Sequence, residues 1–137
     1  MAKRLLFLVL ILAPFCVAFS GCEKDEKKEV AVGGKGGTAT LRFTPMHHSA
    51  YIDSITVYIA YNVQDAPSQY DDSVVATKIG DGKAVAEFTG LKKGYYYVLG
   101  KGYDPGIFQN VKGGIPVTIP EEDSVYNYTL PVTEDGH

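Results

Sequence analysis

Apolar and polar side chains alternate over most of the chain beyond residue 37. In 38–43 every second residue, from Ala39 to Phe43, is apolar, and in 54–61 the run from Ile55 to Tyr61 has the same spacing. A period of two residues is typical of strands with one buried face. Further strands are predicted at 74–79, 83–88, 95–102, 115–119 and 125–132. No stretch beyond residue 37 has a helical pattern of useful length, so the pattern predicts an all-β domain.

Turn chemistry supports the same fold class. Asp81-Gly82, between the third and fourth predicted strands, is typical of a tight hairpin whose two central residues take positive φ. Seven short strands joined by turns predict a single β-sandwich over 38–133, followed by a short tail at 134–137. Because the chain has no tryptophan, we expect aliphatic and tyrosine side chains to form the core.

The first 21 residues have the pattern of a secretory signal. Lys3 and Arg4 precede an apolar run that ends at Phe19, and Ser20-Gly21 then comes directly before Cys22. This segment resembles a bacterial lipoprotein signal, in which Cys22 is lipidated and becomes the first mature residue. A run of about 15 residues is shorter than the roughly 20 that a transmembrane helix needs. We therefore expect attachment to a membrane through lipid rather than through a spanning segment.

Residues 22–37 are predicted to be a flexible tether. Seven consecutive charged residues occupy 23–29, and five residues at 33–37 include four glycines. Within the charged run, Lys24-Asp25-Glu26 resembles the surface-export signal of certain Gram-negative lipoproteins. We expect an outer-membrane protein that faces the cell exterior if this signal operates, and the periplasm if the run is only a tether.

Charge and cysteine content exclude several classes of function. The chain has 13 basic and 16 acidic residues, and two of the cations belong to the signal. A mildly acidic chain has no electrostatic footprint for nucleic acid. Cys16 leaves with the signal and Cys22 carries lipid, so the mature domain has no thiol for a disulfide or a thiolate metal site.

One segment resembles a known family. Phe88-Thr89-Gly90-Leu91-Lys92-Lys93-Gly94-Tyr95-Tyr96-Tyr97-Val98 is similar to a signature of carboxypeptidase regulatory-like and related transthyretin-like sandwiches. Lys101-Gly102-Tyr103 and 125–130 are similar to later parts of the same domain. The resemblance implies a seven-stranded Greek-key sandwich that acts as a spacer, stalk unit or binding accessory. The usual Gly-x-Val turn after the first strand is missing.

Within this signature the residue types have a physical explanation. Gly90 and Gly94 bracket a chain reversal in which positive φ costs a glycine nothing. We expect Leu91 to close the end of the sandwich, and Tyr96 and Val98 to point into the core.

Two groups of residues are candidates for binding ions. Met46-His47-His48 offers a thioether and two imidazoles, which suit copper. Adjacent histidines on an extended chain point to opposite faces, which argues against a shared metal. Two acidic groups are alternatives for calcium, but both lack the spacing of a dedicated calcium loop. They are Asp71-Asp72 with Asp65, and Glu121-Glu122-Asp123.

Tyrosine is the remaining candidate, with ten in the chain. Tyr95, Tyr97 and Tyr103 alternate with the predicted core residues of their strand, and Tyr58 is expected on the same sheet. Tyrosines that share one face form a flat contact surface for protein or glycan. They can also simply cover the sheet.

No arrangement of residues indicates catalysis. The three histidines are His47, His48 and His137, there is no cysteine nucleophile, and the paired acids fall in predicted loops. We therefore predict a lipid-anchored, non-enzymatic interaction or accessory module without a cofactor. The alternatives are a small-ligand or metal-binding lipoprotein that uses Met46–His48, and a glycan-binding component.

Overall fold

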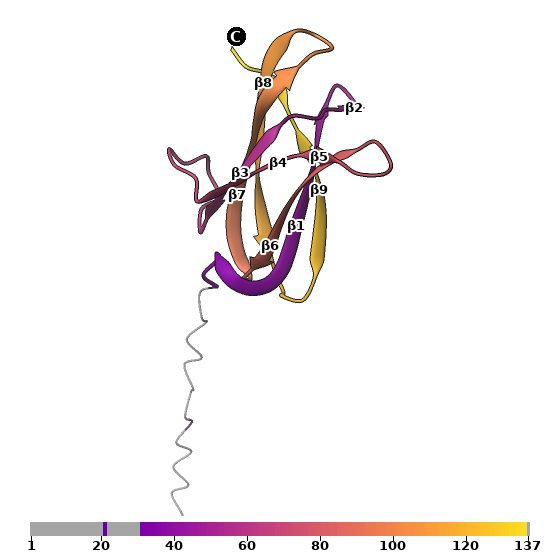
Figure 1. Cartoon of the computed structure of the whole chain (residues 1–137). Coiled ribbons are helices and arrows are strands. Elements are labelled where there is room, and N and C mark those ends of the chain that lie inside the picture. The colour runs from indigo at the N-terminus through magenta and orange to yellow at the C-terminus, as the bar shows by residue number, and fades with distance from the viewer. Residues whose placement is uncertain (1–20, 22–30, 137) are drawn as a thin grey trace, which may run out of the picture.

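The computed structural model describes residue 21 and residues 31–136 as a β protein without helices (Figure 1). Among these residues, no helix is long and apolar enough to cross a membrane. The strands are β1 (Lys35–His47), β2 (Ala50–Tyr51), β3 (Thr56–Tyr61), β4 (Asp72–Val75), β5 (Thr77–Lys78), β6 (Ala84–Leu91), β7 (Gly94–Asp104), β8 (Gln109–Ile119), β9 (Val125–Pro131) and β10 (Thr133–Glu134). Three of these ten strands, β2, β5 and β10, have only two residues each.

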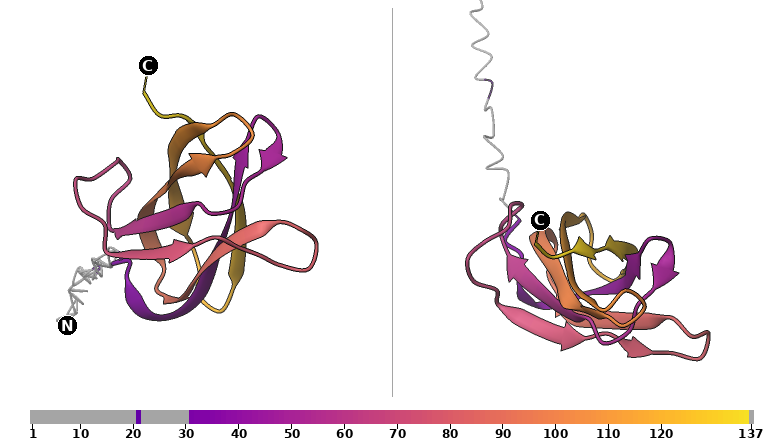
Figure 2. Two further views of the ribbon diagram at one scale, coloured as in Figure 1. Left: turned by 45° about the horizontal axis from the view of Figure 1, so that its top comes forward. Right: turned by 90° about the horizontal axis from the view of Figure 1, so that it is seen from above.

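The strands form two sheets around a common interior (Figure 2). The first sheet has the order β2-β1-β6-β5, and β9 also pairs with β1. The second sheet has the order β10-β8-β7-β3-β4. All pairs are antiparallel except β1 with β9, which is parallel. The predicted all-β class is therefore correct.

The core lies between the two sheets, where the alternating side chains meet. Leu91, Tyr96 and Val98 are fully buried, as the sequence pattern predicts. Phe43 and Phe88 of the first sheet pack edge to face, with ring centroids 6.2 Å apart. The largest fully buried side chains come from both sheets: Tyr96, Phe43, Phe88, Leu41, Ile55, Ile59, Leu91, Ile119 and Leu130.

The predicted strand at 74–79 is wrong in detail, because the chain changes sheets within it. Asp72–Val75 pairs with β3 in the second sheet, whereas Thr77–Lys78 pairs with β6 in the first. Ala76 lies between them, buried, and its N–H donates to the Ile55 carbonyl oxygen at 2.8 Å. An alternating pattern predicts a strand but not the sheet to which it belongs.

The turn at Asp81-Gly82 also differs from the prediction. Only Gly82 has positive φ, at 81°, so the two-residue hairpin with two such residues is not formed. The Gly82 N–H and the Ile79 carbonyl oxygen close the turn at 2.9 Å, and Ile79 N–H donates to the Lys83 carbonyl oxygen. This is a three-residue connection that ends in a left-handed glycine, the next most common hairpin.

The glycine-rich segment belongs to the folded domain, so the predicted tether boundary at residue 37 is wrong. The Gly33 N–H donates to Asn62 Oδ1 at 2.6 Å, and the Gly34 N–H donates to the Tyr96 hydroxyl oxygen at 2.8 Å. β1 then begins at Lys35. A Cβ on Gly37 would lie 2.2 Å from the Leu91 carbonyl oxygen. These glycines permit close packing of the backbone, which composition alone does not distinguish from flexibility.

Candidate functional site

His47, the last residue of β1, lies buried at one end of the sandwich. It is only 2% exposed, and its Nδ1 is 2.8 Å from Asp104 Oδ2. Asp104 is the last residue of β7 in the opposite sheet. The same carboxylate uses Oδ1 to accept the Gly106 N–H at 2.8 Å, which fixes its orientation. His47 therefore connects the two sheets through a positioned carboxylate.

The prediction that His47 and His48 point to opposite faces is wrong. Their rings stack, with centroids 4.0 Å apart and an angle of 27° between the planes. His48 and Ser49 have positive φ, of 45° and 67°, so the chain leaves the extended conformation immediately after His47. The alternation of side chains holds only for extended backbone. Met46 lies before this bend on β1, where successive side chains alternate between the two faces of the strand.

Glu134 completes a group of three potential ligands. Its Oε1 is 3.5 Å from His47 Nε2 and 4.0 Å from His48 Nε2. One ligand atom from each residue lies within 4.8 Å of the other two, and this is the one such group of His, Cys, Asp or Glu among residues 21 and 31–136. Glu134 lies on β10, where the sequence predicted the start of a free tail, so that boundary is wrong too.

The neighbouring charges shift the pKa values of this group. The hydrogen bond to Asp104 raises the pKa of His47 most strongly, burial opposes it, and Glu134 adds to the increase. The hydrogen bond to His47 holds the pKa of Asp104 below its usual value. Glu134 also has a lowered pKa, chiefly through its own backbone N–H and then through both histidines. The arrangement therefore favours positive charge between the two carboxylates.

The His47 Nε2 atom has an unusual environment. It is buried and has no hydrogen-bond partner, and it is the one side-chain nitrogen or oxygen in this state within the described part of the chain. A buried polar atom without a partner costs free energy. Such an atom, 3.5 Å from a carboxylate oxygen and beside a stacked second imidazole, is suited to accept a cation.

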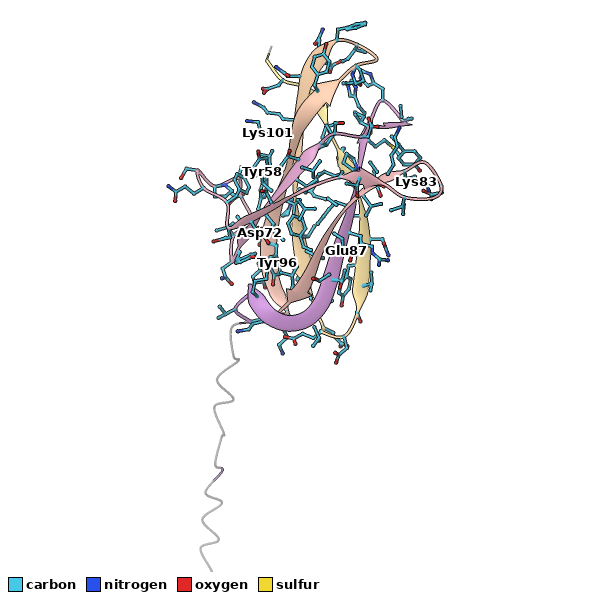
Figure 3. All side chains as sticks on the ribbon, viewed as in Figure 1. Tyr58, Asp72, Lys83, Glu87, Tyr96 and Lys101 are labelled. Carbon is cyan, nitrogen blue, oxygen red and sulfur yellow. The ribbon has the colours of Figure 1, made fainter. Side chains whose placement is uncertain are left out.

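The predicted tyrosines lie on the outer face of the second sheet. Tyr58 pairs with Leu99 in register, and Tyr97 pairs with Ala60 and with Pro116, all on the face opposite the buried Val98. Tyr95 and Tyr103 follow at the two ends of β7, and each is 45% exposed. Figure 3 shows Tyr58 and Lys101 on this flank, whereas Glu87 lies on the flank of the first sheet.

Two further features of this face are not visible in the sequence. The Tyr97 ring lies across Gly114 of β8, where a Cβ would be 2.5 Å from the Tyr97 hydroxyl oxygen. Tyr70, in the loop between β3 and β4, packs on Tyr58 with ring centroids 5.7 Å apart. Burial raises the pKa of Tyr70, and the charge of Tyr97 adds to the increase. The surface defined by Tyr58, Tyr70, Tyr95, Tyr97 and Tyr103 is called the tyrosine face below.

The two acidic alternatives for calcium are used locally instead. Asp71 accepts the Tyr61 N–H at 2.7 Å, and Asp72 pairs with Lys35 at 3.2 Å. Glu122 accepts the Lys93 N–H at 3.3 Å. Asp65, Glu121 and Asp123 are exposed. Asp71, Asp72 and Glu122 therefore support local structure, and the six acids do not converge with a third ligand group on one point within the described residues.

The residues predicted for anchoring and export, Cys22, Lys24, Asp25 and Glu26, lie outside the described residues. Comparison of the chain with protein-family models, with curated proteins and with solved structures gives no match. The resemblance to carboxypeptidase regulatory-like and transthyretin-like sandwiches therefore depends on the sequence motifs between Phe88 and Leu130.

Proposed function

We propose that this protein is a lipid-anchored, non-enzymatic module of the bacterial cell envelope that binds a protein partner through its tyrosine face. The observation that carries the proposal is the alignment of Tyr58, Tyr95, Tyr97 and Tyr103 on one outer face of the second sheet. Tyrosine contributes a large contact area at a low cost in side-chain entropy.

The surroundings of the tyrosines favour a protein over a glycan. Beside Tyr103 a shallow hollow is lined by Lys101, Asn110 and Asp135, among others. In the register of the sheet, Leu99 lies opposite Tyr58 and Pro116 lies opposite Tyr97. Aromatic and aliphatic groups with polar groups at their margin are typical of protein interfaces. Tryptophan, the most effective residue for stacking on sugars, is absent from the chain.

The anchor is proposed from the sequence around Cys22, and the fold is compatible with it. The described chain enters at the end of the sandwich where Gly33 and Gly34 contact Asn62 and Tyr96 (Figure 1). Tyr95, at the start of β7, lies near this end, and Tyr103 lies towards the other. Lys24-Asp25-Glu26 would direct the anchored module to the cell exterior.

In more detail, we propose that the two sheets form a transthyretin-like sandwich. Seven of the ten strands in the described chain have four residues or more. Gly90 has positive φ, at 67°, and Gly94 at 150°, and Leu91 between them is fully buried. These are the roles that the resemblance implies for Gly-Leu-x-x-Gly. Such domains serve as spacers or binding accessories, so the fold supports the interaction role without naming the partner.

A non-enzymatic role is proposed from the character of the acids. Asp53, Asp104 and Glu134 all have lowered pKa values, through Lys78, His47 and the Glu134 backbone N–H respectively. A general acid at neutral pH requires a raised pKa. These carboxylates are therefore suited to hold cations rather than to donate protons.

Site-specific photo-crosslinking in the producing cells tests the interaction. A benzophenone amino acid at Tyr95 or Tyr103 is expected to give one discrete, protease-sensitive adduct, and the same probe at Glu87 on the opposite sheet is expected to give none. Both tyrosine positions are exposed, so the thermal midpoint should stay within about 2 °C of that of the unmodified protein. Absence of an adduct at either tyrosine position, a protease-resistant adduct, or the same products from Glu87 would overturn the proposal.

A further inference from the structure

We propose that His47, His48 and Glu134 form a binding site for a divalent transition metal ion, Zn(II) or Cu(II), with Asp104 as a positioning residue. The site goes beyond the docking role proposed above, and it uses residues outside the tyrosine face. Two imidazole nitrogens and one carboxylate oxygen are ligands that these ions accept, and they leave a fourth position open.

The hydrogen bonds of His47 prepare it as a ligand. When Nδ1 carries the proton and donates it to Asp104 Oδ2 at 2.8 Å, Nε2 carries a lone pair. Metal-binding histidines commonly donate their other N–H to a carboxylate in this way, which fixes the tautomer and the ring orientation. The buried, unpartnered Nε2 lies close to possible ligand atoms of Glu134 and His48, within 4.8 Å of each. A cation at this point would give Nε2 the partner that it lacks.

The distances are close to those of a metal centre. Bonds of roughly 2.0–2.1 Å in tetrahedral geometry place ligand atoms about 3.3 Å apart. Glu134 Oε1 is 3.5 Å from His47 Nε2 and 4.0 Å from His48 Nε2. The side chain of His48 is 71% exposed and can rotate to shorten the remaining separations without disturbing the core. The buried His47 needs no movement, because Asp104 already holds it.

The site joins three segments that are distant in the sequence. His47 ends β1 of the first sheet, Asp104 ends β7 of the second, and Glu134 lies on β10. The Val132 N–H donates to the Met46 carbonyl oxygen at 3.0 Å, which holds the β10 segment against the end of β1. β7 spans 11 residues, or roughly 33 Å of extended chain. The ion would therefore link both sheets at one end of the sandwich. The chain enters at the opposite end, near Gly33 (Figure 1).

Isothermal titration of the full-length protein in detergent with Zn(II) tests the site. The protein carries no histidine tag, and any unprocessed chain that keeps free thiols at Cys16 and Cys22 is alkylated so that neither binds the ion. A single Zn(II) ion is expected to bind, and His48→Ala and Glu134→Gln are each expected to weaken the affinity at least about tenfold. Both residues lie at the surface, so these variants should fold even where His47→Ala does not. Asp104→Asn is expected to weaken binding by roughly 10–100-fold.

Two controls separate this site from non-specific binding. Glu121→Gln removes an exposed acid outside the site and should leave Zn(II) affinity unchanged. The electron paramagnetic resonance spectrum of bound Cu(II) should show two coupled nitrogens in the parent protein and one in His48→Ala. Absence of binding, unchanged affinity in His48→Ala and Glu134→Gln, or equal loss in Glu121→Gln would overturn the proposal.

Discussion

In this protein the position of a residue in the fold, more than its chemical type, decides whether its side chain is buried or lies on the surface. Tyr96 and Tyr97 are neighbours on β7, yet Tyr96 is fully buried and Tyr97 lies on the outer face. The Tyr96 hydroxyl accepts the Gly34 N–H at 2.8 Å and donates to the Lys92 carbonyl oxygen at 2.5 Å. It thereby ties the glycine-rich entry of the chain to the turn between β6 and β7.

The Tyr96 hydroxyl leads to a prediction about stability and pH. Burial raises the pKa of Tyr96 above its ordinary value of 10.0, and nearby Glu122 adds to this. The hydroxyl's contribution is therefore complete below about pH 10 and is lost as the pH rises from there through the folded-state pKa. Tyr96→Phe should lower the free energy of unfolding by about 1–3 kcal/mol at pH 7.5, because the Gly34 N–H loses its acceptor. The difference in the free energy of unfolding between Tyr96→Phe and the parent protein should decrease above pH 10.

Urea denaturation of both proteins at several pH values between 7.5 and 11 measures this effect. Tyr95→Phe is the matched control, since Tyr95 is 45% exposed, and it should change stability by less than about 0.5 kcal/mol. A difference between Tyr96→Phe and the parent protein that stays constant across this range would contradict the prediction.

At the level of elements, glycine decides how closely β1 approaches the turn between β6 and β7. Both Lys35 and Ala39 pair with Leu91, so the register of β1 shifts between them and the strand bulges around the turn. Just before this bulge, the Lys92 N–H donates to the Gly34 carbonyl oxygen at 2.8 Å. A side chain at Gly37, within the bulge, would separate the two segments.

Gly37→Ala tests this close approach. The new Cβ would lie 2.2 Å from the Leu91 carbonyl oxygen and 2.6 Å from the Lys92 Cα, and both are backbone atoms that cannot rotate away. We expect a loss of about 1–3 kcal/mol or more, the range for overpacking, measured as a lower urea midpoint. Gly80→Ala is the control, because a Cβ there meets nothing within 4 Å. Equal stability of the two variants would show that β1 does not need the glycine.

For the molecule as a whole, the sequence N-terminal to the described fold sets the proposed location. The apolar run before Cys22 is too short to span a membrane but has the order of a secretory signal. Two acyl chains hold a protein stably on a membrane, whereas a single chain gives only marginal, reversible binding. Attachment is therefore predicted to depend on one residue, Cys22.

Cys22→Ala should abolish incorporation of a labelled fatty acid and move the protein from the detergent phase to the aqueous phase, or leave it uncleaved. Phase separation followed by autoradiography measures both effects. Cys16→Ala is the matched control, because this cysteine lies within the predicted signal and should not affect labelling. Wild-type labelling and partitioning of the Cys22 variant would remove the basis for the lipoprotein proposal.

The sequence by itself determined the class of the fold and most of its interior. Alternation is a local property, because successive side chains of a strand point to opposite sides, and this placed Tyr96 and Val98 in the core and Tyr97 outside it. Only the tertiary structure decided where the chain changes sheets at Ala76, and that the glycines at 33–37 pack rather than flex. It also assembled His47 with Asp104 and Glu134, which are 57 and 87 residues away along the chain. His47, Asp104 and Glu134 meet because distant strands pair, and the His48 ring joins them because the chain bends at the positive φ of His48. Neither the pairing nor the bend leaves a periodic signal in the sequence.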